Sequence, residues 1–288
     1  MRTSGIFKLL YYPIKFEKFG EPIYIIPFGD VHRHTKLCHL EKWREFLEWA
    51  SKKKRAYFLG MGDHEDGVSK SERKALKAAN FHDTTMDTLD EVFMRFTDEL
   101  AEELSFMKGR LIGILEGNHY AELQSGITTT QYLCQKLGCA YLGSSAFIRV
   151  GLSQNSKHNT RCAVDIWAHH GKGAARKVGG SLNRVEDWSE GAECDICLMG
   201  HDHKKSVGTL SRLYIKSARG GEITLGQRKV LIARTGSFQR GYVDGVKSFV
   251  SDEAMNPTDL GTIKIELTPK RSQINDTDTV EVDIHASI

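Results

Sequence analysis

Five short apolar runs, each ending in a cluster of polar residues, constrain the fold of this chain more than any other feature of its sequence. The runs read IYIIPFGDVH, AYFLGMGDHED, RLIGILEGNHY, CAVDIWAHHG and CDICLMGHDH. Short runs rich in β-branched and aromatic residues and bounded by glycine and polar residues are typical of buried β-strands. We therefore predict five buried strands, each followed by a polar loop at its carboxyl end.

Helical patterns lie between these strands. Apolar residues share one helix face over residues 40–50 and again over 89–107, and a third pattern, TTTQYLCQKLG, ends at Gly138. After residue 205 the helical patterns stop, and the remaining runs predict strands, several of them antiparallel: SVGTL, RLYIKSA, KVLIARTGSF, GTIKIELTP and TVEVDIHA.

An α/β first part followed by β-rich sequence predicts an α/β fold of two packed mixed β-sheets flanked by helices, a four-layer α-β-β-α sandwich. We expect one domain over residues 1–288, with surface insertions near 64–85 and 153–160.

Composition and charge limit the compartment and the partners. The chain has 288 residues, of which 40% are hydrophobic, enough for one large core. Its net charge of +3 is well below that of a dedicated nucleic-acid-binding domain. No apolar run is long enough to span a bilayer, the amino terminus does not have the pattern of a signal peptide, and the six cysteines are scattered through apolar runs. We predict a soluble, cytoplasmic protein without a membrane partner.

The polar clusters at the strand ends supply metal ligands. In open α/β sheets, ligands bind beyond the carboxyl ends of the strands, where all five clusters lie. Carboxylates, an amide oxygen and imidazoles without thiolates favour manganese, iron, zinc or similar divalent ions. About seven candidate ligands are too many for one tetrahedral ion and suit two ions about 3.5–4 Å apart, which hold a hydroxide and clamp a phosphoryl group.

The order of the clusters resembles the calcineurin-like metallophosphoesterase family of binuclear phosphatases and phosphodiesterases. The matching elements are DVH at 30–32, GDHED at 62–66, GNH at 117–119, HH at 169–170 and GHDH at 200–203. RTGSF, ending at residue 238, is similar to the loop that follows the last motif in the family, so the resemblance extends from about residue 24 to residue 238.

The resemblance implies two divalent metal ions, manganese first and iron, zinc, nickel or cobalt as alternatives. It implies seven metal ligands: Asp30, His32 and His203 on one ion, Asn118, His169 and His201 on the other, and Asp63 bridging both. It further implies that His119 is the catalytic histidine and that Asp66 orients it.

Alternation along an extended chain refines the ligand set. His201 and His203 are two residues apart and should point the same way, with Asp202 directed away. His169 and His170 are adjacent, so one of them should point inward, and we favour His169. Tyr120 stands where the family often has an acid.

Basic residues near the motifs are candidates for substrate binding. Lys172 and Arg176 lie in a glycine-rich stretch directly after the histidine pair, and Arg240 follows the TGSF sequence. They could contact additional phosphates or a nucleic-acid backbone, and a solvated loop is an equal alternative.

Three functions remain open. The first is hydrolysis of phosphate esters, with phosphodiesters favoured, by in-line attack of a metal-bridging hydroxide. The second is a metal-dependent nuclease acting on DNA or RNA, and the third is a non-catalytic binding module on the same fold. The expected partner is a phosphate-ester substrate, with nucleotides and nucleic acids among the candidates.

Overall fold

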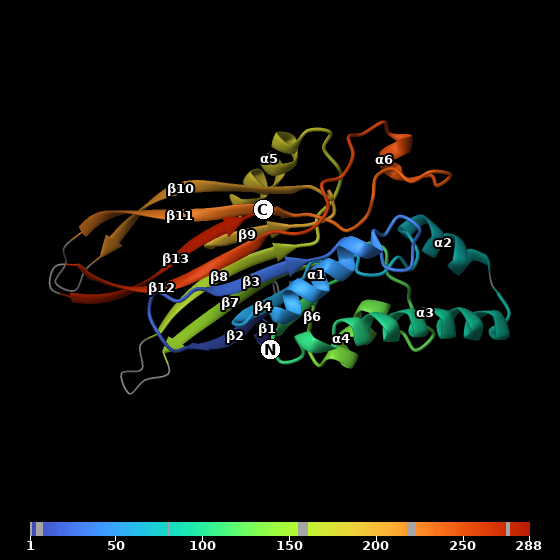
Figure 1. The fold of residues 1–288 in the computed structure, drawn as a ribbon, viewed down its shortest axis with the longest axis horizontal. Helices are drawn as coiled ribbons and strands as arrows, with labels where there is room; N and C mark the ends of the chain where they lie inside the picture. The colour runs from blue at the N-terminus through green and yellow to red at the C-terminus, as the bar shows by residue number, and fades with distance from the viewer. Residues whose placement is uncertain (1, 4–7, 80, 155–160, 218–222, 275–276) are drawn as a thin grey trace.

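Two mixed β-sheets pack face to face at the centre of the molecule and are covered by helices on both outer faces (Figure 1). A computed structural model of the chain describes residues 2–3, 8–79, 81–154, 161–217, 223–274 and 277–288. The predicted α/β class and the predicted layers of two mixed sheets flanked by helices are confirmed.

The larger sheet has seven strands in the order β1-β2-β7-β8-β9-β11-β10 and mixes parallel and antiparallel neighbours. Its strands are β1 (Arg2–Thr3), β2 (Lys8–Phe16), β7 (Ser145–Gln154), β8 (Arg161–His169), β9 (Ile196–Met199), β10 (Lys205–Ser217) and β11 (Ile223–Thr235).

The smaller sheet has six strands in the order β13-β12-β3-β4-β5-β6. Its strands are β3 (Ile23–Phe28), β4 (Ala56–Gly60), β5 (Leu111–Leu115), β6 (Ala140–Gly143), β12 (Lys264–Ile274) and β13 (Thr277–Ser287). Strands β3 to β6 run parallel, so their carboxyl ends lie at one edge of the sheet.

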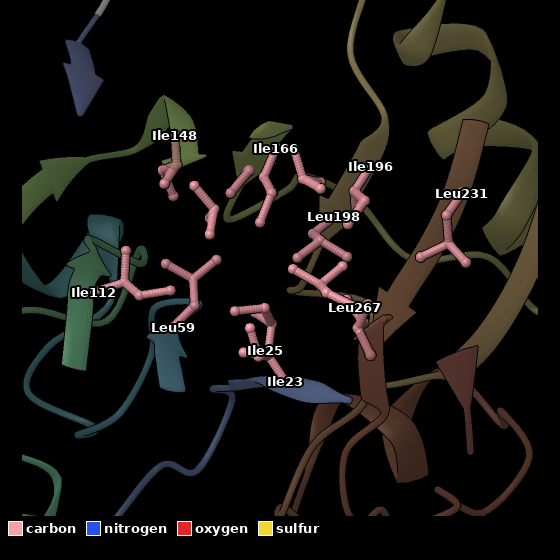
Figure 2. Close-up of a cluster of buried hydrophobic side chains, with 14 of the residues drawn as sticks. Ile23, Ile25, Leu59, Ile112, Ile148, Ile166, Ile196, Leu198, Leu231 and Leu267 are labelled. Atoms are coloured by element: carbon pink, nitrogen blue, oxygen red, sulfur yellow. The ribbon is translucent and has the colours of Figure 1, made fainter. Parts of the chain in front are cut away.

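The main core lies between the two sheets. Figure 2 shows aliphatic side chains of the smaller sheet, such as Ile25 and Leu59, pointing toward side chains of the larger sheet, such as Ile166 and Leu198. Each of these four side chains is fully buried. Burial contributes about 1.5–3 kcal/mol for each such side chain, so this layer holds the two sheets at a defined spacing.

The helices cover the outer faces. Helices α1 (Leu40–Lys52), α3 (Asp83–Glu103) and α4 (Thr129–Leu137) pack on the smaller sheet, where Trp43 and Phe46 contact Phe28. Helix α5 (Val178–Ser189) packs on the larger sheet through Val185. Helix α2 (Lys70–Ala79), the short α6 (Phe249–Asp252) and a 3₁₀ turn at Ser105–Met107 complete the helical elements that the described residues contain.

Local capping signals set the helix ends. Helix α4 begins with a capping box between Thr128 and Gln131 and ends at Gly138, whose left-handed conformation (φ 67°) suits glycine. The prediction that this helix ends at Gly138 is therefore confirmed.

Two details of the predicted β-rich part differ from the structure. SVGTL and the described residues of RLYIKSA form one continuous strand, β10, because pairing with β11 runs unbroken from Lys205 to Ser217. Helix α6 interrupts the stretch where no helix was expected, since Ser248 and Ser251 form a capping box.

The segment at 64–85, predicted as an insertion, holds α2 and the start of α3. Most of the second predicted insertion, residues 155–160, lies outside the described residues. None of the helices in the described part of the chain combines the length and apolarity that crossing a bilayer requires.

Candidate metal centre

The loops that follow β3, β4, β5, β8 and β9 bring carboxylates and imidazoles together. Within each of three groups, the potential ligand atoms lie no more than 4.8 Å from one another. The groups are Asp30, His32 and His203; Asp63, His170 and His201; and His32, Asp66 and His119. Residues from five separate loops thus meet at one edge of the two sheets, as the motif positions predict.

The first group is deeply buried. Asp30 is 0% exposed, and its Oδ2 accepts a hydrogen bond from the His201 backbone N–H at 2.8 Å. The Asp30 Oδ1 atom lies 3.6 Å from His203 Nε2 and has no hydrogen-bond partner among the described residues. Neither ring nitrogen of His32 has a hydrogen-bond partner among those residues either. Burial raises the pKa of Asp30 to about 6. Such a carboxylate is stabilised by a cation or by a proton.

The second group centres on His170. Its Nδ1 donates a hydrogen bond to the Met61 carbonyl at 2.8 Å, which leaves Nε2 directed at Asp63 Oδ2 (3.2 Å) and Asn118 Oδ1 (3.1 Å). His201 Nδ1 lies 3.2 Å from the same Nε2 atom. Burial alone would lower the pKa of His170, but the Asp63 carboxylate raises it to about 9. Because a metal ion requires the unprotonated nitrogen, metal binding here competes with a proton.

His169, the favoured inward histidine, does not point into this group. Its Nδ1 accepts a hydrogen bond from the Gly171 backbone at 2.7 Å, and its ring packs against Trp188 of α5. The reason is the alternation of β8: Ile166 and Ala168 face the other sheet, so His170 does too, whereas His169 lies on the outer face with Trp167. Val164, Ile166 and Ala168 have the same phase as His170, but Trp167 places an apolar residue on the opposite face, so this phase alone does not decide between the two histidines.

Five residues of these groups have left-handed backbone conformations. They are Asp30 (φ 47°), His32 (φ 47°), Asp63 (φ 48°), His201 (φ 69°) and His203 (φ 58°). Each such conformation costs roughly 1–3 kcal/mol when the residue is not glycine, and such residues cluster at functional sites.

Backbone hydrogen bonds between the loops hold this strain in place. Asp30 N–H donates to the Gly62 carbonyl at 2.9 Å, and the backbone N–H groups of Val31 and His32 both donate to the Asp63 carbonyl. The Asp30 carbonyl in turn accepts from Ser237 Oγ at 2.8 Å. The two aspartates are therefore positioned by each other's loops.

Two glycines allow the close approach of these loops. A Cβ atom at Gly117 would overlap Asp63 Oδ1, which accepts hydrogen bonds from the backbone N–H groups of Asn118 (2.7 Å) and His119 (2.9 Å). Gly62 has a φ of +98°, and a Cβ there would meet the His170 ring. Larger residues at either position would displace the candidate ligands.

His119 and Asp66 form a hydrogen-bonded pair beside the metal-ligand groups. His119 Nδ1 contacts Asp66 Oδ1, and the same oxygen lies 3.5 Å from His32 Nδ1. Burial alone would raise the pKa of Asp66, but its hydrogen bond with His119 and the nearby His32 ring lower that pKa well below the ordinary value. A charged Asp66 favours a proton on His119 Nδ1 and leaves Nε2 of that ring available to a substrate.

Asp202 points away from the metal-ligand groups, as expected, although the backbones of His201 and His203 on either side of it are left-handed rather than extended. Its Oδ1 accepts hydrogen bonds from Lys204 Nζ at 2.9 Å and from the Ala175 backbone at 3.3 Å. Arg234, which is 0% exposed, lies on the same side.

The structure gives the surroundings of the three basic residues predicted for substrate binding. Lys172 and Arg176 are exposed and lie between His170 and α5, and Arg176 reaches the Ala254 carbonyl at 3.4 Å. Arg240 donates to the Lys36 carbonyl at 3.3 Å. Their role in substrate binding stays a prediction.

Glu65, inside the GDHED motif, is buried, and in the described part of the chain no ion pair involves its carboxylate; Arg33 lies beside it along the backbone but pairs with Glu103. Burial raises the pKa of its carboxyl from 4.5 to about 8. Its Oε2 lies 3.0 Å from Thr97 Oγ1, which is also 2.9 Å from the Phe93 carbonyl. A hydroxyl can donate only one hydrogen bond. If Thr97 donates its hydrogen bond to the Phe93 carbonyl, its oxygen can accept a hydrogen bond from the protonated carboxyl of Glu65.

We expect Glu65→Gln to stabilise the protein at neutral pH. In the folded state Glu65 keeps a proton that the unfolded chain loses above pH 4.5. The free energy of unfolding therefore falls as the pH rises from 4.5 to about 8. Glutamine cannot lose a proton, so Glu65→Gln removes this pH-dependent loss. The free energy of unfolding should rise by about 2 kcal/mol at pH 7 and stay unchanged at pH 4. Urea unfolding at pH 4, 6 and 8 measures it, and an equal effect at all three values would contradict the burial of a protonated Glu65.

The residues present fit divalent metal ions. Their donors are carboxylate oxygens, imidazole nitrogens and the Asn118 amide oxygen, the hard and borderline donors that suit such ions. Several donor atoms are buried without hydrogen-bond partners in the described part of the chain. The two groups adjoin through Asp63, whose Oδ2 lies 3.9 Å from His32 Nε2.

Comparisons with known proteins show low similarity. No family model matches the sequence, and no curated protein matches it either. Several solved structures match the chain at low identity, among them the following three. Vacuolar protein sorting 29 from Cryptosporidium parvum is 14% identical with a TM-score of 0.37, and the match covers 94% of this chain and 100% of that one.

The other two structures are more distant. A conserved uncharacterized protein from Streptococcus pneumoniae TIGR4, described as a predicted phosphoesterase, is 10% identical with a TM-score of 0.31, over 91% of this chain and 99% of that one. Vps29 from Chaetomium thermophilum is 8% identical with a TM-score of 0.28, over 92% and 96% of the two chains. TM-scores this low establish no family, so the function must be inferred from the side chains of the site.

Proposed function

We propose that this protein is a metal-dependent phosphoesterase of the calcineurin-like type that hydrolyses phosphodiesters. The observation that carries the proposal is the meeting of two groups of buried carboxylate and imidazole atoms, each within 4.8 Å, that adjoin through Asp63. Clustered charges of this kind are costly unless they bind cations, and paired divalent ions are the typical centre for phosphoryl chemistry.

Seven side chains would hold the ions. Asp30, His32 and His203 serve one ion, Asn118, His170 and His201 serve the other, and Asp63 lies between the two groups. Divalent ions bound there supply the Lewis acidity that activates water and offsets charge on phosphoryl oxygens. Manganese is our first choice of ion, with iron, zinc, nickel and cobalt as alternatives.

His119 acts on the leaving group. With its Nδ1–H held by Asp66, the ring can donate a proton from Nε2 to the departing alkoxide oxygen when both ring nitrogens are protonated, and it is then left neutral; the protonated ring also stabilises the charge that develops there. Asp66 acts as the positioning residue, since it touches His119 and His32.

We further propose that the substrate is a phosphodiester and that basic side chains near the site contact it. The described residues of the segment at 64–85 form α2 and the first residues of α3 and include no further domain over the strand ends, which is the basis for proposing an extended substrate. Lys172 and Arg176 are exposed directly after His170, where they could contact phosphates beyond the scissile one. That position makes a nuclease the second candidate, for which affinity for a nucleic acid would fall with salt.

The test measures hydrolysis of aryl phosphodiesters and phosphomonoesters by metal-stripped protein resupplied with manganese. We expect diesters to be cleaved faster and His119→Ala to lower kcat by about 10²-fold. Because a leaving-group acid matters most for poor leaving groups, the loss should be larger for phenyl than for 4-nitrophenyl esters. An equal loss for both would argue against proton donation. Two bound ions without turnover of either ester or of DNA or RNA would favour the binding module.

A further inference from the structure

Arg73 connects helix α2 to the loop that carries Asn118 and His119. Its Nη1 lies 3.0 Å from the Asn118 carbonyl, 2.7 Å from the Tyr120 carbonyl and 2.6 Å from the Val68 carbonyl. A terminal guanidinium nitrogen has two protons, so the three carbonyls share them in a branched arrangement. One cation thereby links both sides of His119 to the start of α2.

The Tyr120 side chain completes the contact. The guanidinium carbon of Arg73 lies 3.8 Å from the centre of the Tyr120 ring, a cation–π distance. The ring supports the flat face of the guanidinium while the nitrogen at its edge reaches the carbonyls. Tyrosine at position 120, where the family often has an acid, therefore has a structural partner in this chain.

Helix α2 has few other attachments among the described residues. It buries none of its own side chains. Its other contacts with the same loop are the Lys77–Glu122 ion pair at 2.6 Å and, just before the helix, the Gly67 N–H bond to the His119 carbonyl at 2.8 Å. The packing of α2 and the geometry of the 118–120 loop therefore depend on each other.

We propose that Arg73 is a positioning residue that holds Asn118 and His119 in the geometry of the active site, with Tyr120 as its platform. The inference rests on the proposed metal centre. The Asn118 carbonyl is held by Arg73 while its Oδ1 lies 3.1 Å from His170 Nε2, so a loose carbonyl would misplace the candidate ligand oxygen. His119 is the next residue, and its imidazole would be displaced with it.

The experiment compares Arg73→Ala with Lys74→Ala. Lys74 is the next residue of α2, is exposed, and loses the same charge on substitution. Manganese binding to the metal-stripped proteins is measured by calorimetry, together with kcat and KM for an aryl phosphodiester and the melting temperature of the ion-free protein. For Arg73→Ala we expect the manganese affinity of one of the two binding events to fall by about tenfold and that of the other to stay unchanged. A loss of this size is typical when a group that supports a metal ligand is removed.

Turnover and the tyrosine variants provide separate readouts. We expect Arg73→Ala to lower kcat by about 10–100-fold with little change in KM. Tyr120→Phe, which keeps the ring, should behave as wild type, and Tyr120→Ala should resemble Arg73→Ala. The double variant should lose little more than either single one, because both remove one contact.

Two results would overturn the proposal. One is equal manganese binding by the Arg73→Ala and Lys74→Ala proteins. The other is a lower melting temperature with both binding events weakened alike, which would indicate a general loss of stability. If one event is selectively weakened but wild type hydrolyses no ester, the positioning role stands and the proposed function fails.

Discussion

Asp63→Asn is expected to lower manganese-dependent hydrolysis by about 10³-fold or more, because it removes a carboxylate charge of the group with His170 and His201 that also lies 3.9 Å from His32 of the first group. The fold should survive. Asp63 Oδ1 accepts the backbone N–H groups of Asn118 and His119, and an asparagine oxygen can accept both as well. Asp63→Asn therefore removes the charge of this side chain while its hydrogen bonds to the 118–119 backbone can be kept.

The measurement for Asp63→Asn combines kcat/KM with manganese binding to the ion-free protein. We expect at least one of two bound ions to be lost while the melting temperature without metal stays the same or rises, since a buried charge has been removed. Asp187→Asn on the exposed surface of α5 is the matched control and should match wild type in every readout. Retention of both ions and of full activity by Asp63→Asn would exclude a bridging carboxylate.

Arg234→Met is expected to produce the largest loss of stability. Arg234 is fully buried and donates to the Gly200 carbonyl at 2.8 Å and to the Ser181 carbonyl at 3.0 Å. Its Nη2 is 4.0 Å from Asp202 Oδ2, an atom without a hydrogen-bond partner among the described residues. Methionine fills the space but leaves these acceptors unpaired, which should lower the free energy of unfolding by about 3 kcal/mol.

Urea unfolding of Arg234→Met and of the exposed control Arg95→Met measures this loss. Adding Asp202→Asn to Arg234→Met should recover part of the stability, because a buried carboxylate that has lost Arg234 and keeps only Lys204 as its cation is then removed. Full additivity of the two substitutions would contradict an interaction between Arg234 and Asp202. Because Gly200 directly precedes His201, we also expect weaker manganese binding by Arg234→Met.

Much of the fold could be predicted because its signals are local. The apolar faces of α1 and α3, the stop at Gly138 and the polar residues after β3, β4 and β5 are all visible within a few residues of sequence. The parallel arrangement of those strands then places their polar ends at one edge. For this reason the sequence alone predicts that Asp30, Asp63 and Asn118 lie at one site.

Other features depended on contacts between distant segments. Whether His169 or His170 faces the site depends on which face of β8 meets the other sheet, and both faces of that strand carry apolar residues. The continuity of β10 depends on its pairing with β11, and the contact of Arg73 with the Asn118 carbonyl joins residues 45 positions apart.

The sequence by itself determined the order of strands and helices and the chemistry of the donor atoms, because hydrophobic periodicity and side-chain type are properties of short segments. Only the tertiary structure decided which donors meet. The left-handed backbones of Asp30, Asp63 and His201 cost energy locally and persist because hydrogen bonds from separate loops hold them. That positioning arises when the two sheets pack and bring those loops to the same edge.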